Sequence, residues 1–147
     1  MQVKEIMTAN PTCCTPESTL QQVAEIMATE DCGCVPVVRD FESMEPIGTI
    51  TDRDITCRTV ARGNNPLEMT AADVMSSPIV TVSEDSNVRE LLELMEQNQI
   101  RRVPVVDASG SCCGMVAQAD VARMAPEEIS GDLVQEISRA SGSSSNV

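Results

Sequence analysis

The sequence contains no histidine, no tryptophan and no tyrosine, and Phe41 is its one aromatic residue. Without an imidazole there is no Ser-His-Asp triad, no Cys-His pair and no zinc site that combines cysteine with histidine. A single phenylalanine cannot form the aromatic platforms on which proteins stack the bases of single-stranded nucleic acids. These absences exclude the commonest hydrolytic mechanisms and one common mode of nucleic-acid binding.

Basic residues are also scarce, with ten Lys and Arg against 23 Asp and Glu, and Lys4 is the single lysine. The formal net charge of −13 opposes binding to a polyanion, so no nucleic-acid polymer is expected as a partner. A guanidinium group matches the geometry of phosphate better than an ammonium group does. The positions of the few arginines therefore indicate where a small phosphorylated ligand is held.

Long hydrophobic runs are missing too. Although 41% of the 147 residues are apolar, no stretch approaches the roughly 18 consecutive apolar residues of a membrane span. The N-terminal residues Met1–Glu5 lack the basic and then apolar pattern of a secretory signal. The length suits one ordinary domain or two small units that share a core. We therefore expect a cytoplasmic protein without a membrane partner.

An internal repeat organises the chain. Three short stretches recur in the same order, the first two after 68 positions and the third after 66. The matched pairs are Val3–Thr8 with Ala71–Ser76, Val35–Val38 with Val103–Val106, and Gly48–Asp54 with Gly114–Asp120. Because three ordered matches are hard to obtain by chance, the chain is predicted to contain two copies of one unit.

Each copy is predicted to run strand–helix–strand–strand–helix. Apolar residues fall at helical spacing over residues 20–27 and 88–95, which indicates a core-facing stripe on the first helix of each copy. Ser18 and Ser86 stand at the expected N-caps, and Gln21 completes a capping box with Ser18. The predicted strands are 35–39, 47–50, 79–82, 103–107 and 115–117. The second helix of the first copy is predicted to run from near Asp54 to Gly63, and that of the second copy to begin near Asp120.

The fold class that follows is α+β (α/β): two pseudo-symmetric β-α-β-β-α units packed through their sheets, plus a C-terminal helix. A unit of about 60 residues is only marginally stable alone, so the two copies are expected to pack together. The predicted division is a first unit over 1–63, a linker over 64–70, a second unit over 71–125, a C-terminal helix over 126–140 and a disordered tail over 141–147.

The Val-Pro-Val-Val strands and the Gly-x-x-Thr-x-x-Asp turn, in register in two copies, resemble those of a tandem CBS-domain pair, or Bateman module. The resemblance runs from Val3 to Met124, and Thr51–Ile55 and Ile100–Val106 are especially similar to small stand-alone bacterial members. It implies a regulatory module that binds an adenine nucleotide in clefts between its two units and transmits occupancy as a conformational or oligomeric change. It also implies a homodimer and a protein effector of unknown identity.

The side chains of Gly48–Asp54 suit a nucleotide on chemical grounds alone. Thr51 offers a hydroxyl and Arg53 a charged donor for phosphate, while an ionised Asp54 only accepts hydrogen bonds and so suits the two vicinal hydroxyls of a ribose. Free N–H groups at the start of the following helix favour a phosphate. The alternative is that Asp54 only caps that helix and Thr51 only closes the turn.

The second copy keeps Asp120 as its ribose-type residue, but Ala117 and Ala119 replace the threonine and the arginine. The resemblance implies that Arg101 compensates, because the side chain two residues before the Val-Pro motif often reaches phosphate in this family. Gly33 occupies that position in the first copy. We therefore expect two related clefts of unequal affinity, with the cleft of the first copy the stronger.

The resemblance further implies composite clefts, in which the ribose-binding aspartate belongs to one copy and the base slot largely to the other. A slot of aliphatic side chains and main chain needs no aromatic residue. Arg58 and Arg102 are interpreted as solvated surface charges. By position, the Asp54 cleft is lined by Met75, Ile79, Val80, Ile100 and Arg101, and the Asp120 cleft by Met7, Thr12, Cys13, Cys32, Gly33 and Cys34.

The cysteines fit no standard framework. Seven is an odd number, which precludes complete pairing within one chain, and two Cys-x(2–4)-Cys pairs of the structural zinc type are missing. We predict no metal site and no catalytic cysteine, and interpret most of the thiols as small buried apolar side chains. A second hypothesis places Cys13 near Cys32 or Cys34 in a redox-sensitive or soft-metal cluster.

These observations predict a sensor without catalysis that requires no cofactor. AMP, ADP or ATP is the expected ligand, with NAD or S-adenosylmethionine as alternatives. Two other functions stay open: a thiol- or metal-responsive protein on a CBS scaffold, and a structural interaction module with degenerate clefts, which Ala117 and Ala119 motivate. A hydrolase or transferase is disfavoured because histidine, the commonest general base, is absent.

Overall fold

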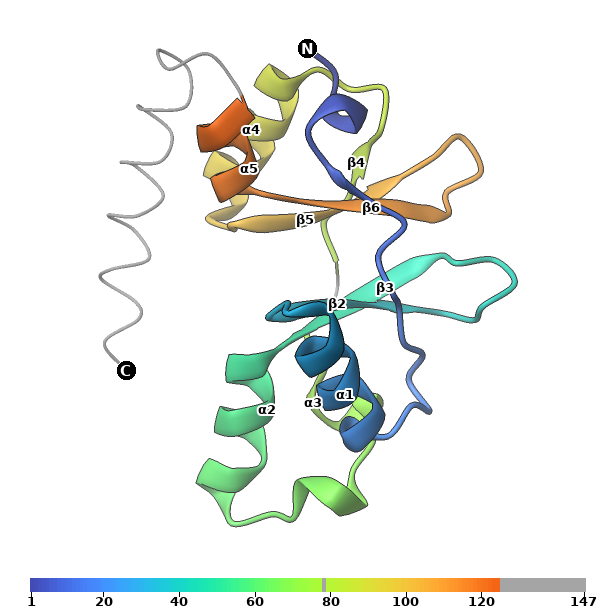
Figure 1. Ribbon diagram of the computed structural model, residues 1–147, viewed down its shortest axis with the longest axis vertical. Helices are drawn as coiled ribbons and strands as arrows, with labels where there is room; N and C mark the ends of the chain where they lie inside the picture. The colour runs from blue at the N-terminus through green and yellow to red at the C-terminus, as the bar shows by residue number, and fades with distance from the viewer. Residues whose placement is uncertain (78, 125–147) are drawn as a thin grey trace. The chain divides into compact units, whose positions relative to one another are not determined.

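The computed structural model describes residues 1–77 and 79–124, which form two compact units (Figure 1). The Asp54 unit comprises Pro11–Ile79 and Gly110–Cys112, and the Asp120 unit comprises Met1–Asn10, Val80–Ser109 and, among the described residues, 113–124. The predicted C-terminal helix over 126–140 and the predicted tail over 141–147 lie outside the described residues.

The Asp54 unit places its helices on one face of an antiparallel β-hairpin (Figure 1). Its elements are α1 (Leu20–Glu30), β2 (Cys34–Val38), β3 (Pro46–Thr51), α2 (Asp52–Arg58), 3-10 helices at Val60–Arg62 and Pro66–Glu68, and α3 (Ala71–Val74). Strands β2 and β3 pair with Cys34 opposite Thr51 and Val35 opposite Ile50. This register brings the start of β2 beside the turn that carries Thr51.

The Asp120 unit repeats this arrangement with a fuller sheet, again with its helices on one face (Figure 1). Its elements are a 3-10 helix at Val3–Glu5, β1 (Thr8–Ala9), β4 (Val82–Ser83), α4 (Val88–Asn98), β5 (Arg102–Val106), β6 (Cys112–Ala117) and α5 (Gln118–Met124). The first residue of β6, Cys112, is counted with the Asp54 unit. The strand order is β1-β6-β5-β4, with β4 parallel to β5. The mixed α/β fold predicted from the sequence is therefore confirmed.

The compact units differ from the sequence repeat at the start of each copy. Thr8 pairs with Met115, so the N-terminal segment belongs to the Asp120 unit. In the Asp54 unit, the N–H of Thr49 donates to the carbonyl oxygen of Ser76 at 3.1 Å, and the N–H of Ser76 donates back at 2.9 Å. Each hairpin thus gains an edge partner from the segment that opens the other copy, which satisfies backbone groups that an open edge would expose.

The first helix of each copy begins one residue later than the predicted caps require. Thr19 caps α1, because its Oγ1 accepts from the N–H of Gln22 at 3.1 Å and the Gln22 Oε1 accepts from the N–H of Thr19 at 2.9 Å. Asn87 caps α4 by accepting from the N–H of Glu90 at 2.9 Å. The predicted caps Ser18 and Ser86, and with them the predicted capping box of Gln21, are wrong. The Ser18 hydroxyl instead accepts from the N–H of Thr15 at 3.0 Å and closes the preceding turn.

The second helix of the first copy is shorter than predicted. It begins at Asp52 and ends at Arg58, and the Thr59 hydroxyl then donates to the carbonyl oxygen of Ile55 at 2.6 Å. Gly63, the predicted end, has φ 77° and instead closes the 3-10 turn that follows. A residue without Cβ adopts this left-handed conformation without strain, which is the physical reason for glycine there.

Each unit has its own aliphatic core. The predicted stripe of the second copy is confirmed, since Val88, Leu91, Leu92 and Met95 are all buried. In the first copy Leu20 and Val23 are buried, but Ala24 is exposed and Met27 is half-buried. The larger core, in the Asp120 unit, consists of Val3, Ile6, Val82, Val88, Leu91, Leu92, Met95, Val103, Val105, Val116 and Val121.

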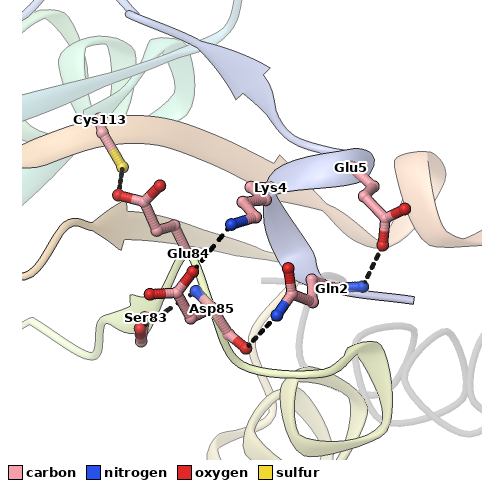
Figure 2. Close-up of polar contacts among 7 residues, drawn as sticks. All are labelled: Gln2, Lys4, Glu5, Ser83, Glu84, Asp85 and Cys113. Atoms are coloured by element: carbon pink, nitrogen blue, oxygen red, sulfur yellow. Dashed lines mark hydrogen bonds and ion pairs between the residues drawn. The ribbon is translucent and has the colours of Figure 1, made fainter.

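The N-terminal segment is held to the loop before α4 by main-chain and side-chain contacts (Figure 2). The Val3 N–H donates to the carbonyl oxygen of Ser86 at 2.8 Å, and the Lys4 Nζ forms an ion pair with Asp85 at 3.0 Å. The Cys113 thiol, on β6, donates to the Glu84 carboxylate at 3.6 Å. These contacts fix the start of the chain within the Asp120 unit.

In the part of the chain that the structure describes, no helix has the length and apolar character needed to cross a membrane.

Candidate functional site

The turn between β3 and α2 presents the predicted ligand-binding residues of the first copy. The Thr51 Oγ1 accepts from the N–H of Asp54 at 3.0 Å, and the Asp54 Oδ2 accepts from the N–H of Thr51 at 2.9 Å. This reciprocal capping box explains why α2 begins here. The capping role weighed as an alternative is thus present in the structure. The capping box uses the Asp54 Oδ2, and the second carboxylate oxygen, Oδ1, is not part of it.

Arg58 contacts that second oxygen. Its Nη2 lies 3.8 Å from the Asp54 Oδ1, and its Nη1 donates to the carbonyl oxygens of Val74 at 2.8 Å and Met75 at 3.2 Å. Because the last carbonyls of a helix have no partner inside the helix, a guanidinium there satisfies them. The interpretation of Arg58 as a solvated surface charge is therefore wrong. The four-residue spacing from Asp54 to Arg58 is the sequence signal that could have indicated the pair.

Replacing Arg58 with methionine should lower the free energy of unfolding by about 1 kcal/mol, because two carbonyl oxygens lose a charged donor in a partly solvated position. Urea unfolding measures this loss. The matched control is Arg62→Met, which removes an exposed arginine from the next turn of the chain. Equal losses in the two variants would contradict a bridging role for Arg58.

Gly48 allows the segment after α3 to approach β3. A Cβ on Gly48 would lie 2.6 Å from the Met75 Cε and 2.7 Å from the Ser76 carbonyl oxygen. Met75, predicted for the Asp54 cleft, therefore packs against the strand that ends at Thr51. The absence of a side chain at Gly48 is required by this close approach, not by an unusual backbone conformation.

The equivalent turn of the Asp120 unit has the same backbone arrangement with fewer polar groups. The Asp120 Oδ2 accepts from the N–H of Ala117 at 2.8 Å, and the Oδ1 accepts from the Arg123 Nη2 at 2.8 Å. A Cβ on Gly114 would collide with the Met7 sulfur, as one on Gly48 would with the Met75 methyl group. Met7, predicted for the Asp120 cleft, thus belongs to the same unit as Asp120.

The residue before β2 contacts the start of α2, and the residue before β5 contacts the start of α5. The Gly33 carbonyl oxygen accepts from the N–H of Asp52 at 3.0 Å, and the Arg101 carbonyl oxygen accepts from the N–H of Gln118 at 2.8 Å. Arg53 is exposed at the start of α2. Of the other predicted lining residues, Ile79, Thr12, Cys13, Cys32 and Cys34 lie in the Asp54 unit, whereas Val80 and Ile100 lie in the Asp120 unit. The composite clefts that combine residues of both units stay a prediction.

Comparison with protein families identifies the repeat. A model of the CBS domain matches residues 3–58 and 71–127. This chain belongs to the CBS-domain family. The two matches follow the two sequence copies, so the protein is a tandem CBS pair, and the resemblance inferred from the Val-Pro-Val-Val and Gly-x-x-Thr-x-x-Asp motifs is confirmed.

Two curated relatives are similar to this CBS pair over most of its length. An uncharacterized protein of Methanopyrus kandleri is 38% identical over 123 residues, which are 84% of this chain and 59% of the relative, so the chain spans well under two thirds of that protein. Hypoxic response protein 1 of Mycobacterium tuberculosis is 34% identical over 134 residues, 91% of this chain and 92% of the relative.

Two solved structures resemble the CBS pair closely. A crystal structure of Hypoxic Response Protein I with two coordinated zinc ions has a TM-score of 0.76 and 34% identity, covering 86% of this chain and 100% of that one. The CBS domain pair of protein MJ0100, in complex with 5′-methylthioadenosine and S-adenosyl-L-methionine, has a TM-score of 0.73 and 26% identity, covering 84% and 98%. Adenosyl ligands are therefore known in a solved relative of this fold.

The CBS pair has a surface hollow of about 400 Å³ between α1 and α2 that the sequence did not indicate. Small residues open it, since Ala24 and Ala28 lie one helical turn apart on α1. Asp52 also lines it, and the Asp52 Oδ2 lies 3.2 Å from the position that a Cβ on Gly33 would occupy. The residues that line the hollow are Ala24, Met27, Ala28, Cys32, Asp52, Ile55 and Thr56.

The cysteines of the CBS pair are arranged differently from the cluster that was hypothesised. None of the seven, all of which lie within the described residues, forms a disulfide. Cys13 packs with Cys112 rather than with Cys32 or Cys34, and Cys14 is part of the main core of the Asp54 unit, where burial raises its pKa to about 12. Across the described part of the chain, no three cysteine, aspartate or glutamate side chains converge on one point.

Proposed function

We propose that this CBS pair is a sensor without catalysis that binds an adenosyl ligand at the turn carrying Thr51 and Asp54. The observation that carries the proposal is the Asp54 carboxylate, whose Oδ2 holds the helix cap while its Oδ1 lies 3.8 Å from the Arg58 Nη2, with 18% of the Asp54 side chain exposed. A carboxylate fixed in this way accepts the vicinal hydroxyls of a ribose without losing its orientation. The adenosyl ligands of the MJ0100 relative support this choice of ligand class.

The neighbouring groups add donors for a charged ligand. The Thr51 Oγ1 accepts from the N–H of Asp54, so its own hydrogen is free to donate to a ligand oxygen. Arg53, exposed one residue before Asp54, supplies a positive charge within reach of a phosphate. The proposal retains AMP, ADP and ATP as first candidates and adds Arg101 as the cation of the composite cleft.

The two turns are proposed to differ in the ligands they accept. Both carboxylate oxygens of Asp120 accept a hydrogen bond within its own turn and helix, but Ala117 and Ala119 contribute no side-chain donor. A ligand without phosphate, such as S-adenosylmethionine, needs fewer donors than ATP does. We therefore propose that the Asp120 turn takes a phosphate-free adenosyl ligand, and that the Asp54 turn discriminates in favour of a phosphorylated one.

Occupancy is proposed to act as a population shift. A ligand that favours one arrangement of the protein changes the contacts offered to a second copy of the chain and to a protein effector. The rival function, a structural interaction module with degenerate clefts, draws its support from Ala117 and Ala119. The metal-responsive alternative draws support from the zinc ions in the Hypoxic Response Protein I structure.

A ligand panel tests the proposal. The melting temperature of the purified protein is measured with AMP, ADP, ATP, NAD, S-adenosylmethionine and 5′-methylthioadenosine. A ligand present at 100 times its Kd adds about 2.7 kcal/mol to the free energy of unfolding. We expect at least one member of the panel to raise the melting temperature, and no conversion of that ligand to product during the measurement. If no member does so, the structural rival is favoured.

A further inference from the structure

Three sulfur-bearing side chains meet in a small buried cluster of the Asp54 unit. Cys13, Val38 and Cys112 form this cluster, and the side chain of Met44 packs against it. Cys13 and Cys112 are each 7% exposed. The Cys112 thiol forms a hydrogen bond with the Cys13 thiol, and this contact, together with burial, raises the pKa of Cys13 above its usual range. At neutral pH the Cys13 thiol therefore keeps its proton, which it donates to the Pro11 carbonyl oxygen at 3.4 Å.

The backbone around the sulfur cluster is firmly held. The Cys112 N–H donates to the Met44 carbonyl oxygen at 2.7 Å, and the Ser111 hydroxyl donates to the Ser43 carbonyl oxygen at 2.6 Å. Met44 has φ 53°, a left-handed conformation that is uncommon for a residue with a long side chain. The Asp40 carbonyl oxygen accepts from its N–H at 3.0 Å. Residues held in such uncommon backbone conformations cluster at functional sites.

An acidic surface hollow reaches the cluster at Cys13. It has a volume of about 550 Å³, and Cys13 lines its wall. Glu25 and Glu30 border it, and the Thr12 hydroxyl donates to the Glu30 carboxylate at 2.8 Å. Carboxylates around an opening raise the local concentration of cations. The hollow therefore attracts cations to the side of the cluster at which Cys13 lies.

We propose that the sulfur atoms of Cys13, Cys112 and Met44 bind one soft monovalent cation, Cu(I), which enters through this acidic hollow. Thiolate and thioether sulfur are the ligands that select Cu(I), whereas structural zinc requires four ligands. Histidine, the usual nitrogen ligand, is absent from the chain. The site is independent of the turn that carries Asp54.

Binding exchanges one cation for another. One thiol loses its proton to solvent and becomes a thiolate bonded to Cu(I), while the second thiol and the thioether coordinate as neutral ligands. No electron is transferred, and the buried site is neutral before and after binding. The apparent affinity should therefore rise about tenfold for each unit of pH near neutrality, because the proton must leave before the metal binds.

The test is a competition for Cu(I) between the full chain and a chromogenic Cu(I) chelator, under reducing and oxygen-free conditions. We expect the wild type to take one equivalent of Cu(I). Cys112→Ala should weaken binding at least about 100-fold and Met44→Leu at least about 10-fold, because even the loss of a group that only supports a metal ligand costs about 10- to 100-fold in affinity. The matched control is Cys57→Ala, which removes an exposed thiol of the same unit and should leave the affinity unchanged.

Two results would overturn the proposal. One is a wild-type protein that takes no Cu(I) from the chelator, and the other is wild-type affinity in both Cys112→Ala and Met44→Leu. Thermal melting of the metal-free variants checks that they fold. Met44→Leu conserves volume, so it keeps the test informative even if Cys112→Ala unfolds.

Discussion

Asp54→Asn should remove most of the stabilisation that an adenosyl ligand gives to the protein. Asparagine has the shape of aspartate, and its carbonyl oxygen still accepts from the N–H of Thr51, so α2 keeps its cap. The ribose hydroxyls lose a charged acceptor, which is worth about 1.5–3 kcal/mol. At a ligand concentration 100 times the wild-type Kd, the added free energy of unfolding should fall from about 2.7 to about 0.3–1.3 kcal/mol. Ligand-dependent thermal melting measures both values.

Asp73→Asn is the matched control for this substitution. The Asp73 Oδ2 accepts from the N–H of Thr70 at 2.9 Å, which reproduces the capping geometry of Asp54 at the start of α3. The control should lose no ligand-dependent stabilisation, because no ligand contact is proposed for α3. A full ligand effect in Asp54→Asn would restrict Asp54 to its capping role and contradict the proposed site.

Gly48→Ala should lower the free energy of unfolding by about 1–3 kcal/mol, the usual cost of inserting a methyl group where no space exists. The new Cβ would lie 2.6 Å from the Met75 Cε and 2.7 Å from the Ser76 carbonyl oxygen. The methionine side chain can move away. The Ser76 carbonyl cannot, because its segment exchanges two hydrogen bonds with Thr49. Urea unfolding monitored by circular dichroism measures the loss.

Gly33→Ala provides the comparison for Gly48→Ala. Its nearest neighbour would be the Asp52 Oδ2 at 3.2 Å, the end of a flexible side chain on the surface. The loss of stability should therefore be smaller than for Gly48→Ala. Gly48→Ala is also expected to weaken ligand binding, since it displaces Met75 beside the Asp54 turn. Equal stability of the two variants would show that the segment at Met75 and Ser76 yields more easily than its hydrogen bonds indicate.

Local sequence patterns were sufficient to predict most of the secondary structure. The helical stripe through Leu91, Leu92 and Met95 is buried as predicted, because a helix must turn one face of apolar side chains towards its core. The caps were misplaced by one residue because Ser18 and Thr19 are both good capping residues in sequence. Only the backbone conformation at Thr19 decides which of them caps the helix.

The sequence also indicated the candidate residues Thr51 and Asp54, since their spacing recurs in the family motif. It did not indicate that Asp54 divides its two oxygen atoms between a helix cap and Arg58. Residue spacing identifies partners within one helical turn, but it cannot assign separate contacts to each oxygen atom of a carboxylate.

By itself, the sequence determined the repeat, the aliphatic cores and the absence of histidine chemistry, because each of these follows from residue type and periodicity. The tertiary structure alone decided that Arg58 meets the carbonyls of Val74 and Met75, and that Cys13 packs against Cys112. The partners in these contacts are 16 residues or more apart in the chain. Such pairs are brought together by the folding of the whole unit, and no local pattern in the sequence encodes the distance between them.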